Sequence, residues 1–503
     1  MTLAEKVTRG IAWNFVATSA GVLVGVLSSI VLARLLGKVD WGAYSVVVSF
    51  SSVLSTFAAF GLDFAPSRFI PEYGKKWTLL RRIIKLRLIP ILLFSVPLFF
   101  LSDNLAWILL QDVKDGIYFK IVAVTLIPVG LSGVYQSFLQ STFQQKFTST
   151  FTLVYLSFNF IYSVYALSLG LGVFGILFVQ LIGNTLLAVG SAYWLHATIL
   201  EKDCGTCGIS SRRILEYSVV LGLYLFMNMA LGKELDTLMI GSFIKDKNVS
   251  AGYYNIAYTF SFTLLSFFSN ALMGGMMVAS ISELYVKKNF EGLRNAYKVY
   301  FEYLYFFVTP SCALGLIFSQ EFISVLYGEE YLAAAYYAFL YFPVLFIAKL
   351  GGINATYLSS TDSEKRLLTS RLIFGSINFT LNLFLIPLIG VVGAILGTMF
   401  ATIFGTAYEC VLVHRLVKPE YPVRFLAKVA IASLFASVVC YPVRNYLISL
   451  GLNDILVLMF GLGIMSACYL AFVKLLRPFS KETRDVILSS KIPMKKSLEW
   501  FVQ

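Results

Sequence analysis

The chain has 503 residues, of which 58% are hydrophobic and 13% are charged, and its mean hydropathy is +0.79. Soluble domains carry roughly 45–50% apolar and 25% charged residues, so this composition excludes an ordinary soluble protein. The formal charge of +13 is spread over short segments between apolar runs. That pattern fits a protein held among anionic lipids, not one that binds nucleic acid.

Apolar runs of about 20 residues recur along the chain, and each is long enough to cross a hydrocarbon core of about 30 Å as a helix. Backbone groups in lipid must hydrogen-bond within their own segment, so these runs are predicted to be helices. We therefore expect an all-α polytopic membrane protein with about fourteen transmembrane helices. The predicted spans are 11–33, 43–64, 87–110, 118–141, 150–169, 172–194, 216–243, 251–279, 299–318, 332–357, 367–388, 391–413, 425–446 and 454–475.

The loops between these spans alternate between rich and poor in basic residues. The positive-inside rule places the basic loops in the cytoplasm, together with the N-terminus and the tail 477–503. An even number of spans requires the two termini to share a side, so the two signals agree. We expect a multi-pass protein of a prokaryotic cell membrane with both termini cytoplasmic. The basic loop residues are Lys75, Lys76, Arg81, Arg82, Lys85, Lys146, Lys202, Arg212, Arg213, Lys287, Lys288, Arg294, Lys298, Lys365, Arg366, Arg415, Lys418 and Arg424.

Neither a cleaved signal peptide nor a metal site is predicted. The first apolar run is too long for a signal peptide, and Arg34 follows it where a small-residue cleavage pattern would stand. Cys204 and Cys207 form one CxxC pair, and His196 is a potential third ligand. A structural zinc site needs four ligands and no fourth is evident, so we expect no metal and no other cofactor.

Two stretches about 210 residues apart have similar sequences, and further pairs of similar segments follow in the same order. Such ordered similarity indicates a duplication, and duplicated bundles in membrane proteins are typical of transporters. The echoes are Gly42 and Tyr44 with Gly252 and Tyr254 (offset 210), 138–146 with 357–365 and Asn159 with Asn378 (offset 219), and 172–177 with 390–395 (offset 218).

The duplicated unit holds six spans, so the second copy enters the membrane from the same side as the first. The copies are therefore predicted to be parallel repeats that form two six-helix lobes, with two extra helices at the C-terminal end. The predicted parts are an N-lobe at 1–195, a cytoplasmic interlobe linker at 196–215, a C-lobe at 216–415, the last two spans at 416–476 and a cytoplasmic tail at 477–503.

The sequence of the repeat resembles that of a known family. The segment ARLLG at 33–37, followed by GAY at 42–44, is similar to the opening of polysaccharide exporters. Asp236, Gly241 and GYY at 252–254 are similar to the start of that family's second lobe. These exporters include the O-antigen-type and lipid-linked oligosaccharide flippases of the multidrug/oligosaccharidyl-lipid/polysaccharide superfamily. The resemblance covers most of 1–415, and it implies alternating access that moves an undecaprenyl- or dolichyl-diphosphate-linked sugar outward.

Charged residues at mid-membrane depth are costly in lipid and usually face a cavity or each other. Lys233 and Lys349 are the candidates to line an interlobe cavity and bind the diphosphate of the lipid carrier. Glu234 or Asp236 is the candidate to exchange a proton or a sodium ion during the cycle. Asn14 and Asn378 are neutral candidates for hydrogen bonds to the substrate.

Simpler interpretations stand beside these roles. Lys233 and Asp236 are three residues apart and could form a neutralised pair that pins helices. Interhelical packing explains an intramembrane asparagine equally well. No acid lies within a helical turn of Lys349, which favours a cavity for that residue. Arg34, Arg68, Arg371 and Glu409 are expected to snorkel or to set topology near the membrane boundary.

Three other functions share part of this pattern. A multidrug/cation antiporter of the same superfamily would share the lobes but normally stops near twelve spans. A membrane glycosyltransferase would need paired external acids, for which Asp112 and Asp115 are the weak candidates. No nucleotide-binding loop or catalytic triad is evident, and we expect no enzyme activity. A non-transporting scaffold would have no use for charges at mid-membrane depth.

Overall fold

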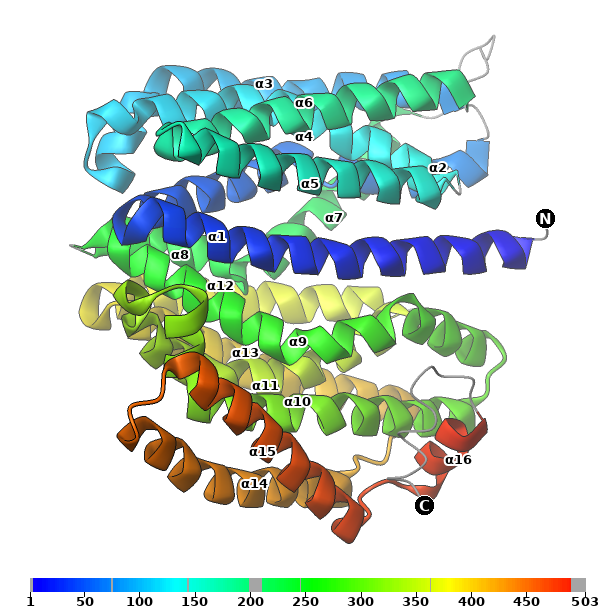
Figure 1. Cartoon of the computed structure of the whole chain (residues 1–503). Helices are drawn as coiled ribbons and strands as arrows, with labels where there is room; N and C mark the ends of the chain where they lie inside the picture. Colours follow the sequence, from blue (N-terminus) through cyan, green and yellow to red (C-terminus); the bar gives the residue numbers. More distant parts are fainter. Residues whose placement is uncertain are drawn as a thin grey trace. The chain divides into compact units, whose positions relative to one another are not determined.

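The structure is a computed structural model that describes residues 3–73, 76–142, 144–198, 210–244, 246–361 and 363–489, and all regular elements in these ranges are helices. The chain divides into two compact units, which are described separately (Figure 1). The first unit comprises Met1–Asn255 and Gly375–Gly397, and the second comprises Ile256–Phe374 and Thr398–Gln503. The predicted lobe and linker boundaries stay a prediction.

The elements are α1 (Leu3–Ala59), η1 (Leu62–Phe64), α2 (Ala65–Tyr73), α3 (Lys76–Leu110), η2 (Val113–Asp115), α4 (Gly116–Ser141), α5 (Gln145–Ser168), α6 (Gly172–Thr198), α7 (Ser211–Ala230), α8 (Lys233–Phe243), α9 (Lys247–Val286), α10 (Phe290–Leu326), η3 (Glu329–Tyr331), α11 (Ala333–Ser359), α12 (Glu364–Ile389), α13 (Val391–Val417), α14 (Val423–Ser449), α15 (Asp454–Leu476) and α16 (Lys481–Ser489).

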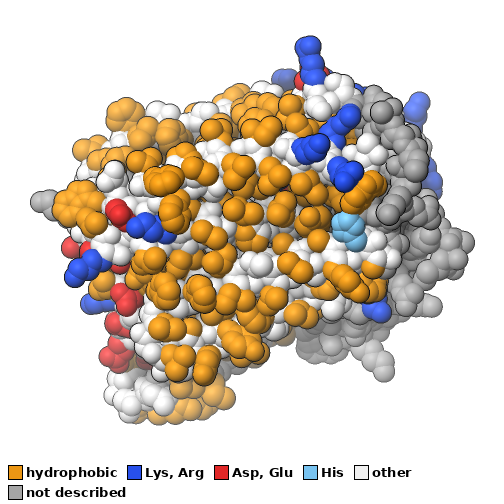
Figure 2. All heavy atoms as spheres, turned by 90° about the horizontal axis from the view of Figure 1, so that it is seen from above, with side chains coloured by type: hydrophobic (Ala, Val, Ile, Leu, Met, Phe, Trp, Pro, Cys, Tyr) orange, Lys and Arg blue, Asp and Glu red, His pale blue; other side chains and the backbone are white. Residues whose placement is uncertain are grey.

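The predicted all-α membrane class is confirmed. Eleven helices in the described part of the chain are long and apolar enough to cross a membrane, and the bent pair α7 and α8 makes a twelfth if it counts as one span. The difference from fourteen lies in two places. Helix α1 contains the first two predicted spans, and α9, the predicted eighth span, is not among the eleven. Figure 2 shows hydrophobic side chains across the middle of one face, with acidic and basic side chains gathered towards its ends.

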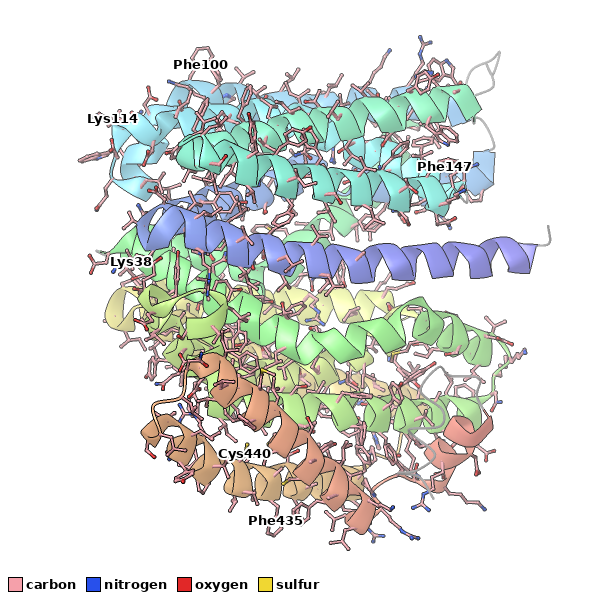
Figure 3. The ribbon with its side chains drawn as sticks, in the orientation of Figure 1. Lys38, Phe100, Lys114, Phe147, Phe435 and Cys440 are labelled. Atoms are coloured by element: carbon pink, nitrogen blue, oxygen red, sulfur yellow. The ribbon has the colours of Figure 1, made fainter. Side chains whose placement is uncertain are left out.

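Helix α1 is two helices joined at Gly37. A straight helix of its 57 residues would be about 85 Å long, far more than a membrane needs. Gly37 has φ 74° and ψ 167°, a backbone conformation that residues with a Cβ rarely adopt. Lys38, the next residue, lies at the same end of the first unit as Lys114, and Phe147 lies at the opposite end (Figure 3). This arrangement agrees with the predicted alternation of the loops.

In the first unit, α4 packs between α3 and α6, and α5 packs against α1 and α6 (Figure 1). A buried ion pair joins η1 to α3, since Arg87 lies 3.3 Å from the carboxylate of Asp63. Ser137 of α4 donates a hydrogen bond to the carbonyl of Asp63. Apolar side chains such as Phe69 and Phe138 form a core around this turn.

In the second unit, α10 is the central helix and packs against α11, α14, α15 and α16. The C-terminal helix α16 is held at its start by the buried carboxylate of Glu302, which accepts hydrogen bonds from the backbone and side chain of Ser480, each 3.0 Å long. Helices α14 and α15 form a hairpin, within which the thiol of Cys440 approaches the carbonyl of Gly461 (Figure 3).

The duplication is visible in the backbone of equivalent turns. The hydroxyl of Thr142 donates to the carbonyl of Phe138 as α4 ends. At an offset of 219, Thr361 donates to Tyr357 in the same way as α11 ends. The next helix begins at equivalent positions, 145 and 364. The matching backbone bonds are Gln144 to Leu139 with Ser363 to Leu358, and Phe147 to Gln144 with Arg366 to Ser363.

Two equivalent glycines of the repeat touch each other in the first unit. A Cβ added to Gly252 would lie 3.2 Å from the Cα of Gly42. A Cβ added to Gly42 would lie 1.7 Å from the carbonyl oxygen of Asn248. The helices at these positions therefore approach backbone to backbone, and only glycine fits without a shift.

We predict that Gly42→Ala lowers the thermal stability of the purified chain in detergent. Its methyl group must displace backbone, a type of overpacking that costs about 1–3 kcal/mol. The matched control is Gly25→Ala on the same helix, where an added Cβ meets nothing within 4 Å. Equal unfolding temperatures for the two variants would contradict the close packing.

Candidate functional site

A broken helix builds the site in the first unit. Helices α7 and α8 meet at Leu231 and Gly232 with a bend of 60°. The break frees backbone groups that an unbroken helix would pair, and a membrane offers no water to replace them. The side-chain amide of Asn378 on α12 donates to the carbonyl of Ala230, at 2.7 Å. Asn378, a predicted site residue, thus supplies a hydrogen bond to a carbonyl at the break.

Asp236 lies in the first turn of α8 and is fully buried. Its Oδ2 accepts a hydrogen bond from the hydroxyl of Tyr254 at 2.5 Å, and its Oδ1 accepts one from the amide of Asn382 at 2.6 Å. The N-terminal end of a helix favours a negative charge, which suits a carboxylate at this position. The buried acid is therefore held by a helix terminus and two donors.

The amides of Asn378 and Asn382 leave two oxygen atoms beside this carboxylate. Both Nδ2 atoms donate, which fixes the orientation of each amide, and neither buried Oδ1 has a hydrogen-bond partner among the described residues. A Cβ added to Gly397 on α13 would lie 2.1 Å from Oδ1 of Asn382 and 3.3 Å from that of Asn378. The four-residue spacing puts both amides on one helix face. Oxygen atoms of this kind suit a hard cation, and the carboxylate can also take a proton.

Lys233 and Glu234 begin α8, directly after the break. The ammonium of Lys233 lies 3.4 Å from Oδ1 of Asn255 and donates to it. Glu234 lies close to the break, since a Cβ added to Gly232 would lie 2.9 Å from its Oε2. Both predicted charges therefore lie in the same short region as Asp236, although the roles assigned to them stay predictions.

Lys349 belongs to the second unit, on α11. Its Nζ donates to the hydroxyl of Ser266 at 2.6 Å and lies 5.0 Å from the centre of the Phe262 ring. Both partners belong to α9. The ammonium is thus held by one hydroxyl and one aromatic face.

The equivalent region of the first copy lacks this chemistry. Tyr44, the counterpart of Tyr254, accepts from the amide of Gln180 at 2.9 Å. Asn159, the counterpart of Asn378, donates to the carbonyl of Tyr155 in its own helix at 2.8 Å. Both of these hydrogen bonds join neutral groups, whereas the hydrogen bond of Tyr254 in the second copy goes to an acid.

Other predicted residues have different outcomes. Asn14 lies on α1, but its side chain is outside the described residues, and Cys204 and Cys207 also lie outside them. The boundary role expected of Arg371 and Glu409 stays a prediction, and the structure adds that Glu409 is buried and lies 3.1 Å from the guanidinium of Arg371. An ion pair therefore joins α12 to α13.

Sequence reasoning missed Tyr254 as a partner of Asp236, and it missed Gly397 and Phe262. The spacing of Asn378 and Asn382 was the available signal, because two amides four residues apart mark a polar helix face. The donors to Asp236 come from 18 and 146 residues away, which no local pattern reveals.

The fold defines a class, that of polytopic helical membrane proteins. A solved structure titled as the lipid II flippase MurJ, inward closed conformation, has a TM-score of 0.73 at 18% identity and covers 95% of this chain and 100% of that one. A multidrug resistance MATE family transporter of the MOP superfamily, in an inward-facing conformation, has a TM-score of 0.59 at 14% identity, with 80% and 96% covered.

A family model described as polysaccharide biosynthesis protein matches residues 31–336, which is more than half of the chain. The chain belongs to this polysaccharide biosynthesis protein family, so the resemblance seen in the sequence is confirmed. An uncharacterized membrane protein of Methanocaldococcus jannaschii is 24% identical over 459 residues, which cover 84% of this chain and 86% of that protein.

We predict that Asn378→Ala destabilises the chain more than Asn159→Ala does. The first change takes a donor from the carbonyl at the helix break, which costs about 1–3 kcal/mol when the carbonyl is left unpaired. The second change takes a donor from a carbonyl that an intact helix still pairs. Thermal unfolding of both variants in the same detergent measures the difference, and a larger loss for Asn159→Ala would contradict this account of the break.

Proposed function

We propose that the chain flips a lipid-diphosphate-linked oligosaccharide or polysaccharide repeat unit from the cytoplasmic to the outer leaflet of the cell membrane. The two repeat copies would alternate access to the two sides, with both termini in the cytoplasm. Membership of a polysaccharide biosynthesis family supports the glycan, and the fold of a protein named as a lipid II flippase supports the lipid carrier.

The observation that carries this proposal is the half-buried position and the partners of Lys349. Lys349 is the seventeenth residue of a 27-residue membrane-length helix, and its ammonium contacts a hydroxyl and an aromatic ring. An ammonium at such depth is costly in hydrocarbon and indicates a polar path. A lysine is also a suitable point charge for phosphate. Lys233 and Asn378 are proposed as further substrate contacts at the helix break.

Ion coupling is the second part of the proposal. Asp236 would bind and release a proton or a sodium ion during each cycle, with Glu234 as the other acid on α8. The partnerless oxygens of Asn378 and Asn382 support Asp236 as the main site. Release of the ion would leave the carboxylate of Asp236 with the donors from Tyr254 and Asn382 alone. Ion binding and the local conformation would therefore be linked.

A multidrug/cation antiporter is the second candidate. Its support is the MATE-like fold together with a buried carboxylate, which could bind a cationic drug. The glycosyltransferase alternative loses support, because Asp112 is the N-cap of η2. Its Oδ1 accepts a hydrogen bond from the backbone N–H of Lys114 at 2.9 Å. A helix-capping role explains that acid without catalysis.

We predict that Lys349→Ala and Lys233→Ala each slow flipping by about tenfold, the cost of one lost charge-assisted contact. The assay uses the full chain in vesicles with a fluorescent lipid-linked sugar. Lys287→Ala is the control, because that lysine is exposed and pairs with Glu283. Wild-type rates in both correctly inserted variants would refute the lysine assignment, and a wild type that moves only cationic drugs would establish the second candidate.

We predict that Asp236→Asn abolishes the response of flipping to an imposed sodium or proton gradient. The substitution keeps the shape of the side chain and removes the charge that binds the ion. Asp246→Asn is the control, since Asp246 is exposed and lies just beyond α8. The same vesicles measure both variants, and a gradient response in Asp236→Asn equal to that of wild type would rule out coupling at this acid.

A further inference from the structure

An aromatic strip leads to Lys349 in the second unit. Tyr258, Phe262 and Ser266 are four residues apart on α9, so they lie on one helix face. The rings of Tyr258 and Phe262 are stacked, with centres 5.8 Å apart and planes 8° from parallel. Ser266 ends the strip with its hydrogen bond from Lys349.

Helix α11 runs beside this face in the same direction. Tyr341 meets the ring of Tyr258 edge-on at 5.4 Å, and Lys349, eight residues later, meets Phe262 and Ser266. Eight helical residues span about 12 Å, so the strip has the length of a small saccharide attached to a phosphate. Aromatic rings occupy one end of the strip and an ammonium the other.

Phe262 is the accessible part of the strip. Its side chain is 40% exposed, whereas Tyr341 and Ser266 are buried. An exposed ring on a membrane helix normally faces lipid, but the ammonium of Lys349 lies over this ring. Because a charge is costly against hydrocarbon, that face of Phe262 borders a polar space.

We infer that this strip recognises the saccharide of the transported lipid, an inference that rests on the proposed function. Lys349 binds the phosphate next to the sugar, and Phe262, backed by Tyr258, stacks against the apolar face of the first sugar ring. Both contacts use the negative face of an aromatic ring, which attracts an ammonium as well as the polarised C–H groups of a sugar. In the empty protein Lys349 occupies the face of Phe262. When Lys349 moves to the phosphate, it leaves that face free for the sugar.

The test compares two lipids on the full chain in nanodiscs, undecaprenyl diphosphate-glucose and undecaprenyl diphosphate, by native mass spectrometry. We expect wild type to bind the sugar-bearing lipid more tightly by about tenfold, the effect of one good contact. Phe262→Leu removes this preference, so that the two lipids bind with equal affinity, while Phe262→Tyr keeps the preference. Lys349→Gln weakens both lipids equally.

The matched control is Phe435→Leu, because Phe435 on α14 is 49% exposed and also stacks on a second ring, Phe472. It should bind both lipids as wild type does. A preference that survives in Phe262→Leu, or a wild type that binds both lipids equally, overturns the inference and leaves the flippase proposal standing. A wild type that binds neither lipid overturns both.

Discussion

The structure depends on how a membrane helix can be broken without leaving bare polar groups in hydrocarbon. At Leu231 and Gly232 the chain stops one helix and starts another at 60°. The carbonyl exposed by this bend is taken by Asn378, and the new helix terminus favours the buried charge of Asp236. These features depend on one another. The amide of Asn378 pairs the carbonyl at the break, and the first turn of α8 stabilises the carboxylate of Asp236.

The two copies of the repeat differ in this arrangement within the described part of the chain. The turns of the two copies keep the same hydrogen bonds, as Thr142 and Thr361 show. The equivalent asparagines differ, because Asn159 bonds within its own helix while Asn378 reaches a broken one. The turns are therefore shared by both copies, whereas the acid beside a broken helix is described in the second copy.

Much of the fold was predictable, because a membrane imposes strong and local constraints on sequence. The length of the apolar runs, the charge of the loops and the repeated segments predicted the protein class, the order of the helices and the equivalent turns. The break in α7 and α8 was not predictable, since a single Gly232 in an apolar run is common in membrane helices. The same limit applies to the pair of Arg371 and Glu409, whose burial depends on the packing of α12 against α13. Of the site, Asp236 and Asn378 were identified, whereas the partners that hold Asp236 come from distant segments.

The contact of Gly42 with Gly252 couples the two copies of the repeat. Residues that meet their own equivalents lie at the axis of a symmetric interface, where each partner offers the same surface to the other. A Cβ at position 42 would lie 1.7 Å from the backbone oxygen of Asn248, and one at position 252 would lie 3.2 Å from the Cα of Gly42. A side chain at either position therefore requires the helix of the other copy to shift, so neither position can gain one independently.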